Sequence, residues 1–379
     1  MRLRLLFFVP RKECRIVFRQ APDYVFLMLV LLLTGSGLFM VASAGEVWGQ
    51  FNYENPFYFV QRQAFFAAIG LIIMAGISTV DYRIWKKIAK PLLLLAFFLL
   101  IAVLIPGIGM VRNGSQSWIG VGSLSFQPSE LMKIALIFYF SVLLSERKKV
   151  IHLFWKGLFT PLFVLVMAFG LIMLQPDLGT AAVMGGTAFL LLFIAGARIR
   201  FFVMTGLFAL GGLVILIASA PYRMKRITAY LDPWSDPLGS GFQIIQSLYA
   251  VGPGGLFGHG YGESRQKYYY LPEPQTDFIF AIWAEETGLI GAVFIMTLFF
   301  LLIWRGIHIG MRTQDPFAAL LVCGITAMIS LQSFINLGVV IGLMPVTGVT
   351  LPFLSYGGSS LTMTLASAGI VLGISRLKG

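Results

Sequence analysis

Long, nearly unbroken apolar runs constrain the fold of this chain more than any other feature. The run Leu92–Ile105 contains only aliphatic and aromatic residues, and similar runs recur along the sequence. A helix of about 20 apolar residues spans the hydrocarbon core of a bilayer, and only helices and closed barrels satisfy the backbone in lipid. Barrel strands alternate in polarity over about 10 residues, which these runs do not. The chain is therefore expected to be an all-α, polytopic membrane protein.

The composition excludes a soluble fold. Of the 379 residues, 58% are apolar and 12% are charged, whereas about 25% are charged in an average soluble domain. We find no internal repeat and expect a single membrane domain over residues 1–379. Ten membrane-spanning helices are expected, at residues 23–45, 61–79, 91–105, 128–144, 157–175, 178–196, 201–219, 278–303, 317–340 and 359–375.

The distribution of basic residues predicts the orientation of these spans. The net charge is +12, and most of the 28 Lys and Arg residues fall in one set of alternate connections and in both tails. The positive-inside rule places that set in the cytoplasm. Residues 1–22 are then a cytoplasmic basic tail, the C-terminus is cytoplasmic, and residues 220–277 form a large external loop between the seventh and eighth spans. This pattern indicates a role at the cell membrane, and no nucleic-acid partner is expected.

The first apolar run, Tyr24–Ala44, follows a basic stretch and ends in Ala-Ser-Ala, as a signal peptide does. It is longer than the roughly 7 to 15 residues of a signal-peptide core. We therefore expect it to be retained as the first span.

The external loop at residues 220–277 is too rich in aromatic residues to be a disordered linker. Apolar residues recur at helical spacing between Phe242 and Tyr249, which predicts a short helix at the membrane interface or one that packs on the bundle. Three cations, Arg223, Lys225 and Arg226, lie on the outer side against the general trend. They indicate either an anionic ligand such as a lipid-linked pyrophosphate or ordinary contact with lipid headgroups.

Two ionisable residues, Glu130 and Lys133, are predicted on one face at the outer end of the fourth span, just after Pro128. Ionisable groups in lipid need a partner or a function. The two side chains either pair with each other, or Lys133 points into an outward-facing cavity and meets an anion or another carboxylate.

Asp277 lies at the start of the eighth span, in a segment held by Pro272 and Pro274. It is either a helix N-cap or, with Glu273 nearby, a general base. Asp177 is expected to cap the sixth span.

Adjacent helical positions point about 100° apart, so at most one of Glu285 and Glu286 readily faces a given cavity. We expect both carboxylates to be buried against partners that satisfy them. The glycine-rich stretch at residues 252–262 matches no nucleotide-binding motif, so tight turns or a close approach of the backbone to a ligand are expected there. Residues 355–360, including Ser359, open the last span, either for close packing or to bind phosphate at a helix N-terminus.

Beyond these local patterns, the chain resembles the SEDS proteins (shape, elongation, division and sporulation), whose members include RodA, FtsW and SpoVE. The resemblance rests on ordered blocks: Trp118–Lys133, Gln175–Thr180, Leu231–Leu238, Gly241–Ser247, Ser264–Phe280, Ala284–Gly291, Asn336–Gly348 and Leu351–Ser360. Gln275 departs from the pattern, because many members carry His at this position.

The resemblance implies a ten-helix glycosyltransferase that polymerises lipid II outside the cytoplasmic membrane during division or sporulation, with a class B penicillin-binding transpeptidase as its partner. It implies that Asp277 is the catalytic carboxylate and Lys133 the basic residue near it. We expect Asp277 to deprotonate the acceptor hydroxyl in an inverting reaction, with its pKa lowered by Lys133 if the two meet. Residues expected to contact the substrate are Trp118, Glu130, Arg223, Arg226, Glu273 and Ser359.

Two further points stay open at this stage. A divalent cation, Mg²⁺ or Mn²⁺, could assist the departing pyrophosphate, although no zinc-binding spacing occurs. The competing function is a lipid II flippase, because ten spans with intramembrane charges also suit alternating access.

Overall fold

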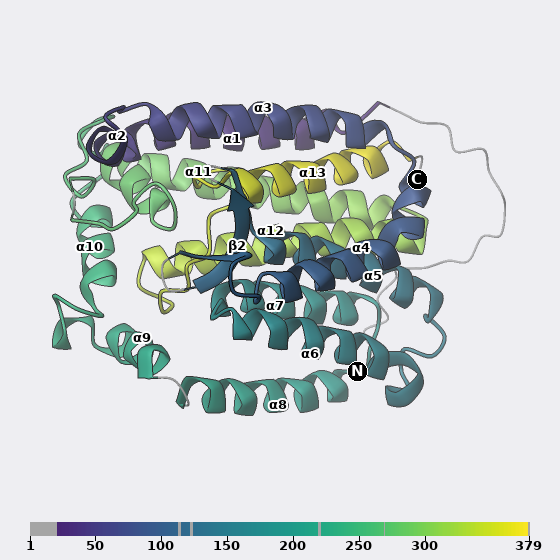
Figure 1. Ribbon diagram of the computed structural model, residues 1–379. Coiled ribbons are helices and arrows are strands. Elements are labelled where there is room, and N and C mark those ends of the chain that lie inside the picture. The colour runs from purple at the N-terminus through teal and green to yellow at the C-terminus, as the bar shows by residue number, and fades with distance from the viewer. Residues whose placement is uncertain (1–20, 113–114, 122–123, 219–220, 269, 378–379) are drawn as a thin grey trace.

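The computed structural model is a bundle of helices with one small sheet (Figure 1). It describes residues 21–377 apart from 113–114, 122–123, 219–220 and 269. The predicted all-α class is therefore right in its main feature. The longer helices lie roughly along one common direction, with α1 (Tyr24–Ala44) and α3 (Tyr58–Thr79) on one side of the bundle and α8 (Ile199–Ala218) on the opposite side.

The other helices fill the space between these sides and cover one end. They are α2 (Glu46–Tyr53), α4 (Tyr82–Ala102), α5 (Pro128–Glu146), α6 (Phe159–Leu174), α7 (Leu178–Ile194), α9 (Pro221–Leu231), α10 (Phe242–Val251), α11 (Ile279–Arg312), α12 (Pro316–Val340) and α13 (Gly358–Ser375). A π-helical turn, Phe154–Leu158, precedes α6, and a 3₁₀ turn, Pro233–Ser235, follows α9.

Seven helices of the described part are long and apolar enough to cross a membrane: α1, α3, α5, α6 with the turn before it, α11, α12 and α13. The other three predicted spans coincide with α4, α7 and α8, all of which are helical. The helices are confirmed, whereas the count of ten crossings stays a prediction. Of the seven, α5 and α12 are the most deeply buried, and together they form the centre of the bundle.

Short polar residues start several of these helices, as capping rules require. Asp23 accepts a hydrogen bond from the amide of Phe26 at 2.9 Å, and Asp315 accepts one from Ala318 at 2.9 Å before α12. Helix α5 begins instead with Pro128, whose missing N–H costs nothing in a first turn.

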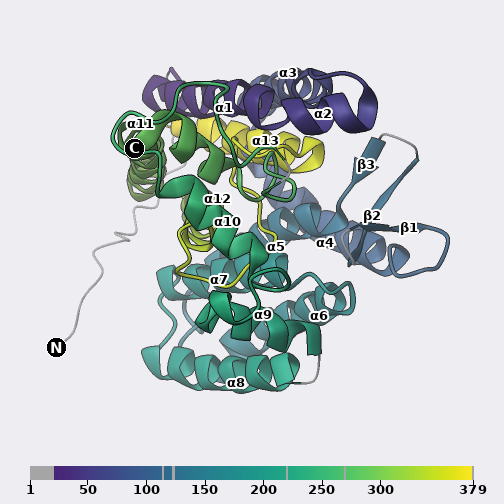
Figure 2. The same ribbon diagram turned by 90° about the vertical axis from the view of Figure 1, so that its left-hand side faces the viewer.

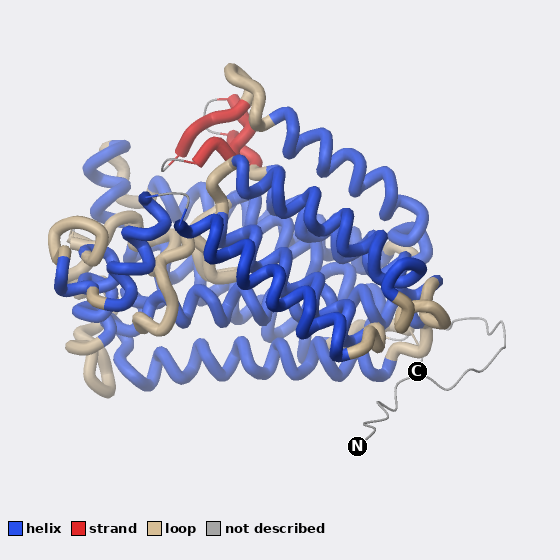
Figure 3. The backbone as a smooth tube through the Cα atoms, turned by 90° about the horizontal axis from the view of Figure 1, so that it is seen from below, coloured by secondary structure: helices blue, strands red, loops and turns tan. Residues whose placement is uncertain are grey.

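A three-stranded antiparallel sheet lies between α4 and α5, and the sequence did not predict it. Its strands are β1 (Gly109–Arg112), β2 (Ser115–Val121) and β3 (Leu124–Phe126), in that order, with Met110 opposite Trp118. The sheet stands at one edge of the helices (Figure 3). The hydroxyl of Ser115 bonds the carbonyl of Gln175, which ties the sheet to the turn before α7.

Residues 220–277 contain the short helix predicted near 242–249, which is α10. The same segment also contains α9, and α2 follows α1; neither of these helices was predicted. Helices α9 and α10 cover one end of the bundle (Figure 2). The start of α1 and the end of α13 meet at the other end, where the Asp23 amide donates to Ser375 at 3.0 Å.

Helix α11 is broken at Gly288, where φ is 67° and ψ is −163°. The glycine-rich loop at residues 252–262 supplies the hydrogen bonds that this break removes. The amides of Leu289 and Ile290 donate to the loop carbonyls of Gly255 and Leu256 at 2.9 and 3.2 Å. In return, the carbonyls of Glu285 and Glu286 each accept a loop amide at 3.0 Å.

Glycine is required where this loop meets the helix. A Cβ on Gly258, whose φ is 76°, would lie 2.1 Å from the carbonyl oxygen of Glu286. The loop backbone therefore approaches α11 closely, whereas the expected approach to a ligand stays a prediction.

Candidate active site

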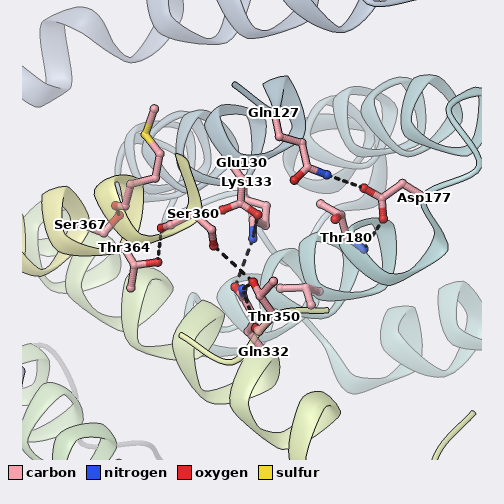
Figure 4. A network of polar contacts seen from close by, with 12 residues as sticks. Gln127, Glu130, Lys133, Asp177, Thr180, Gln332, Thr350, Ser360, Thr364 and Ser367 are labelled. Carbon is pink, nitrogen blue, oxygen red and sulfur yellow. Dashed lines mark hydrogen bonds and ion pairs between the residues drawn. The ribbon is translucent and has the colours of Figure 1, made fainter. Parts of the chain in front are cut away.

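Five segments converge near the end of the bundle that α9 and α10 cover. They are the first turns of α5, the turn before α7, residues 272–278 before α11, the connection 341–357 between α12 and α13, and α9. Figure 4 shows the polar side chains of α5, α7, α12 and α13 in this region. Each segment carries at least one residue that the sequence marked as a candidate.

Lys133 and Glu130 form a buried ion pair on α5. The ammonium lies 2.8 Å from the Glu130 carboxylate, and the two side chains are 3% and 8% exposed. Lys133 also donates to Oε1 of Gln332 at 3.1 Å (Figure 4). Beside it is a cavity of about 10 Å³, otherwise lined mainly by apolar side chains of α5 and α7, a volume with room for about one water. Mutual pairing, one of the two expected arrangements, is confirmed.

Asp277 lies two residues before α11 and is partly buried. Its side chain does not cap the helix, so the N-cap alternative is wrong. Its backbone carbonyl accepts a hydrogen bond from Nδ2 of Asn336 at 2.7 Å. Its Oδ2 lies 3.7 Å from the position that a Cβ on Gly348 would take. The carboxylate therefore sits against the connection between α12 and α13.

Burial and, to a smaller extent, the Glu273 carboxylate raise the pKa of Asp277, while Arg226 opposes the shift, and the resulting pKa is about 7. Lys133 is not among the groups that act on it, and within the described residues its contacts are Glu130 and Gln332. Lys133 is expected to lower this pKa only if it meets Asp277, and that condition is not fulfilled among the described residues, because the ammonium is already engaged on α5.

Glu273 shares the site with Asp277, as their spacing suggested. Its φ of 46° is unusual for a residue with a side chain. The hydroxyl of Thr276 donates to the Glu273 carbonyl at 2.9 Å and approaches its carboxylate at 3.3 Å. The turn at residues 273–276 thus brings the carboxylates of Glu273 and Asp277 into one site.

Asp177 caps α7, as expected, by accepting from the Thr180 amide at 3.0 Å. It also accepts from Nε2 of Gln127 at 3.1 Å (Figure 4). Burial raises the pKa of Asp177, and its charge contributes to the raised pKa of Asp277. The Asp177 carboxylate therefore contributes to the electrostatics of the site around Asp277.

The segment 347–349 packs closely against the start of α7. A Cβ on Gly179 would lie 2.5 Å from the Thr347 carbonyl oxygen and 2.7 Å from the Val349 side chain. Since Asp277 faces Gly348 in the same segment, these few residues link the two carboxylates.

One cation reaches the site from α9. The guanidinium of Arg226 is exposed and donates to the carbonyl of Val346 at 3.1 Å, and Tyr230 on the same helix donates to Leu343 at 3.0 Å. Helix α9 is thereby attached to the connection that holds Asp277. The side chain of Arg223 lies outside the described part of the structure.

Two other expected substrate contacts lie on neighbouring elements. Ser359 is in the first turn of α13, and its buried hydroxyl has no hydrogen-bond partner among the described residues. Trp118 lies on β2, partly buried.

Glu285 and Glu286 are buried with partners, as expected. Glu285 accepts from the amide of Arg265 at 2.8 Å and from the hydroxyl of Ser264. Glu286 accepts from the hydroxyl of Ser43 at 2.5 Å. Both carboxylates therefore fasten neighbouring elements to α11.

No group of three His, Cys, Asp or Glu side chains in the described part could hold a metal ion. The carboxylates of this site do not form a metal cage on their own, so a divalent cation stays an expectation. The chemistry argued below uses only side chains of the chain.

Comparisons with known proteins agree on one family. Residues 23–378 match the FtsW/RodA/SpoVE model, described as "Cell cycle protein". The chain is 56% identical to stage V sporulation protein E of Bacillus subtilis (strain 168), over 94% of this chain and 98% of that protein. It is 44% identical to a probable peptidoglycan glycosyltransferase FtsW of Geobacter sp. (strain M18), with the same coverage.

A solved structure shares the fold. It belongs to work titled "Structural coordination of polymerization and crosslinking by a peptidoglycan synthase complex" and aligns with a TM-score of 0.77 and 33% identity. The alignment covers 94% of this chain and 98% of that one.

Proposed function

The chain belongs to the FtsW/RodA/SpoVE family of cell cycle proteins, and from this premise we propose that it is a peptidoglycan glycosyltransferase that polymerises lipid II. Relatives of similar length are named peptidoglycan glycosyltransferases, and a structure of the same fold comes from a peptidoglycan synthase complex. The apolar helices make this chain a multi-pass membrane protein.

Asp277 is the general base in this proposal. It removes the proton from the acceptor 4-hydroxyl as that oxygen attacks the anomeric carbon of the donor, and the bond to the pyrophosphate breaks with inversion. A base works best when its pKa lies near the operating pH. A pKa of about 7 suits this task, because the ionised carboxylate is still available at neutral pH and is a stronger base than that of an ordinary Asp.

The leaving pyrophosphate requires positive charge. Arg226 is exposed and attached to the connection beside Asp277, which supports a role in binding phosphate, and Arg223 lies on the same helix. Lys133 is not a free cation, because it forms an ion pair with Glu130. Its proposed catalytic contribution is therefore to the electrostatic field of the site. Glu273, Ser359 and Trp118 complete the proposed substrate contacts.

The orientation in the membrane follows from the loop charges. We place both termini, including residues 1–22, in the cytoplasm and residues 220–277 outside, as parts of one membrane domain. The described chain begins and ends at the end of the bundle opposite α9 and α10, which supports this arrangement. A class B penicillin-binding transpeptidase is the proposed partner.

The observation that carries the proposal is the Asp277 carboxylate, set beside Gly348 with a pKa near neutrality. Its test is the conversion of lipid II into glycan chains by purified protein in detergent, with the partner transpeptidase present and its own active site blocked. Detergent solution has no two membrane faces, so polymer there reports chemistry and not transport. We expect polymer from the wild type and a loss of about 10²- to 10⁴-fold for Asp277→Asn, the usual range for general-base catalysis.

Two outcomes would overturn parts of this proposal. Absence of polymer from the wild type, together with lipid II translocation in vesicles, would establish a flippase instead. Normal polymerisation by folded Asp277→Asn would keep the enzyme but remove Asp277 as its base, leaving Glu273 as the next carboxylate to test.

A further inference from the structure

Two amide side chains, Gln332 and Asn336, lie one helical turn apart on the largely apolar central helix α12. They are 3% and 1% exposed. A buried amide is costly unless it is hydrogen-bonded, and an apolar residue would pack there without that cost. The hydrogen bonds that these two amides make therefore account for their presence on α12.

Asn336 joins two segments of the candidate active site. Its Nδ2 donates to the carbonyl of Asp277 and to the carbonyl of Val349, both at 2.7 Å. Carbonyl oxygens only accept, so the amino group must face them, and Oδ1 has no partner among the described residues. Both N–H bonds of the amide are thus used to hold Asp277 against the connection between α12 and α13.

Gln332 makes the corresponding link to Lys133. Its Oε1 accepts from the ammonium at 3.1 Å, and its Nε2 donates to the Thr350 carbonyl at 3.2 Å. These bonds run from α5 through α12 to the connection (Figure 4). Thr350 directly follows Val349, so the two amides hold consecutive carbonyls. An unbroken path leads from Lys133 through Gln332, residues 349–350 and Asn336 to Asp277.

We propose that Gln332 and Asn336 are positioning residues that hold Lys133 and the backbone of Asp277 at a fixed spacing during glycosyl transfer. This inference rests on the proposed function. Neither side chain is assigned a contact with the substrate; each acts through the group that it holds. A displacement of about 1 Å at a reacting group costs about 10²-fold in rate. The hydrogen bonds of these two buried amides are therefore enough to affect the rate.

The test uses full-length protein in detergent with lipid II and the blocked partner transpeptidase, with rates expressed per folded molecule. Asn336→Ala frees Asp277 from Val349, and we expect kcat to fall about 10- to 100-fold with KM changed less than about threefold. Water then reaches the carboxylate, so the acid limb of the kcat–pH profile should move to lower pH. Gln332→Met, close in shape, should lower kcat without moving that limb, because Lys133 does not act on the pKa of Asp277.

Ser333→Ala is the matched control. Ser333 lies beside Gln332 and is 2% exposed, and within the described residues its hydroxyl donates only to the Ile329 carbonyl of its own helix, at 2.8 Å. It should keep the wild-type kcat and pH profile.

Three results would count against the inference. If Asn336→Ala lowers only the yield or the melting temperature, while its folded fraction keeps the wild-type kcat and acid limb, Asn336 is merely structural and the inference is overturned. If Gln332→Met keeps the wild-type kcat, the link to Lys133 has no role in positioning. If the wild type and Ser333→Ala both make no polymer, the proposed function fails and this inference falls with it, a result distinct from the first two.

Discussion

The ammonium of Lys133 lies 2.8 Å from the carboxylate of Glu130, one turn away on α5, and both side chains are almost inaccessible. Removing one member of a buried pair leaves the other charge uncompensated, which costs about 3 to 5 kcal/mol. Lys133→Met and Glu130→Gln should each lower the melting temperature markedly, and the double variant should recover much of the loss. Thermal unfolding in detergent checks this.

The exposed pair of Lys86 and Glu146, 3.0 Å apart, is the control. Surface pairs contribute about 0 to 1 kcal/mol, so Lys86→Met should unfold almost as the wild type does. Equal destabilisation by Lys86→Met and Lys133→Met would contradict the distinction between these pairs.

Arg226 should set the acid limb of the activity profile. Its positive charge lowers the pKa of Asp277, so Arg226→Ala should raise that pKa above about 7 and move the limb to higher pH. The profile of polymerisation rate between pH 5 and 9 measures the shift. Lys225→Ala removes a neighbouring cation that does not act on Asp277, and it should leave the limb in place.

Glu273 should have the opposite effect. Its negative charge raises the pKa of Asp277, so Glu273→Gln should lower that pKa and move the same limb to lower pH. Glu273→Asp keeps the charge and should shift the limb less. A shift in the same direction as that of Arg226→Ala would show that the two residues do not act through charge.

Asp277→Asn should stabilise the protein at neutral pH. The folded-state pKa of about 7 lies above the ordinary value of 3.8, so between these values the folded protein binds a proton that the unfolded chain has released. The free energy of unfolding of the wild type therefore falls as the pH rises through this window. The amide of Asp277→Asn does not ionise, so the variant does not lose this stability.

Thermal unfolding as a function of pH tests this prediction. The melting temperature of Asp277→Asn should match the wild type below about pH 4 and exceed it increasingly up to about pH 7. Asp236 is the control, because the Ser240 amide lowers its pKa; Asp236→Asn should give no gain at any pH. A constant difference at all pH values for Asp277→Asn would contradict the mechanism.

The orientation of the chain can be tested with single cysteines in a background without Cys14 and Cys323. Leu238 is 90% exposed and lies between α9 and α10, so Leu238→Cys in intact cells should react with an impermeant thiol reagent. Lys149→Cys, exposed after α5, should react only after the membrane is disrupted. The reverse pattern would invert the proposed topology.

The sequence predicted the helices well because long apolar runs and their polar ends are local signals. It also anticipated the pair of Glu130 and Lys133, because three residues along a helix bring side chains onto one face. The spacing from Phe242 to Tyr249 predicted α10 for the same reason.

Other features depend on contacts that no local pattern contains. Gln332 and Asn336 look like isolated amides in an apolar helix until the connection after α12 folds back over them. The pKa of Asp277 is raised mainly by burial; Arg226 lowers it and Asp177 raises it, and these two residues lie 51 and 100 positions earlier in the sequence. The sheet at Gly109–Phe126 consists of strands of only three to seven residues, too short to give a clear periodic signal.

Because of the break at Gly288, the directions in which side chains point on one part of α11 do not depend on the rotation of the other part. In a continuous helix, inserting one residue turns everything beyond it by about 100°. Here the carbonyls of Gly255 and Leu256 fix Leu289 and Ile290 independently of the turn that precedes Gly288. The part beyond the break can therefore change its length and the face it shows to lipid, while the short part that follows Asp277 keeps its own orientation.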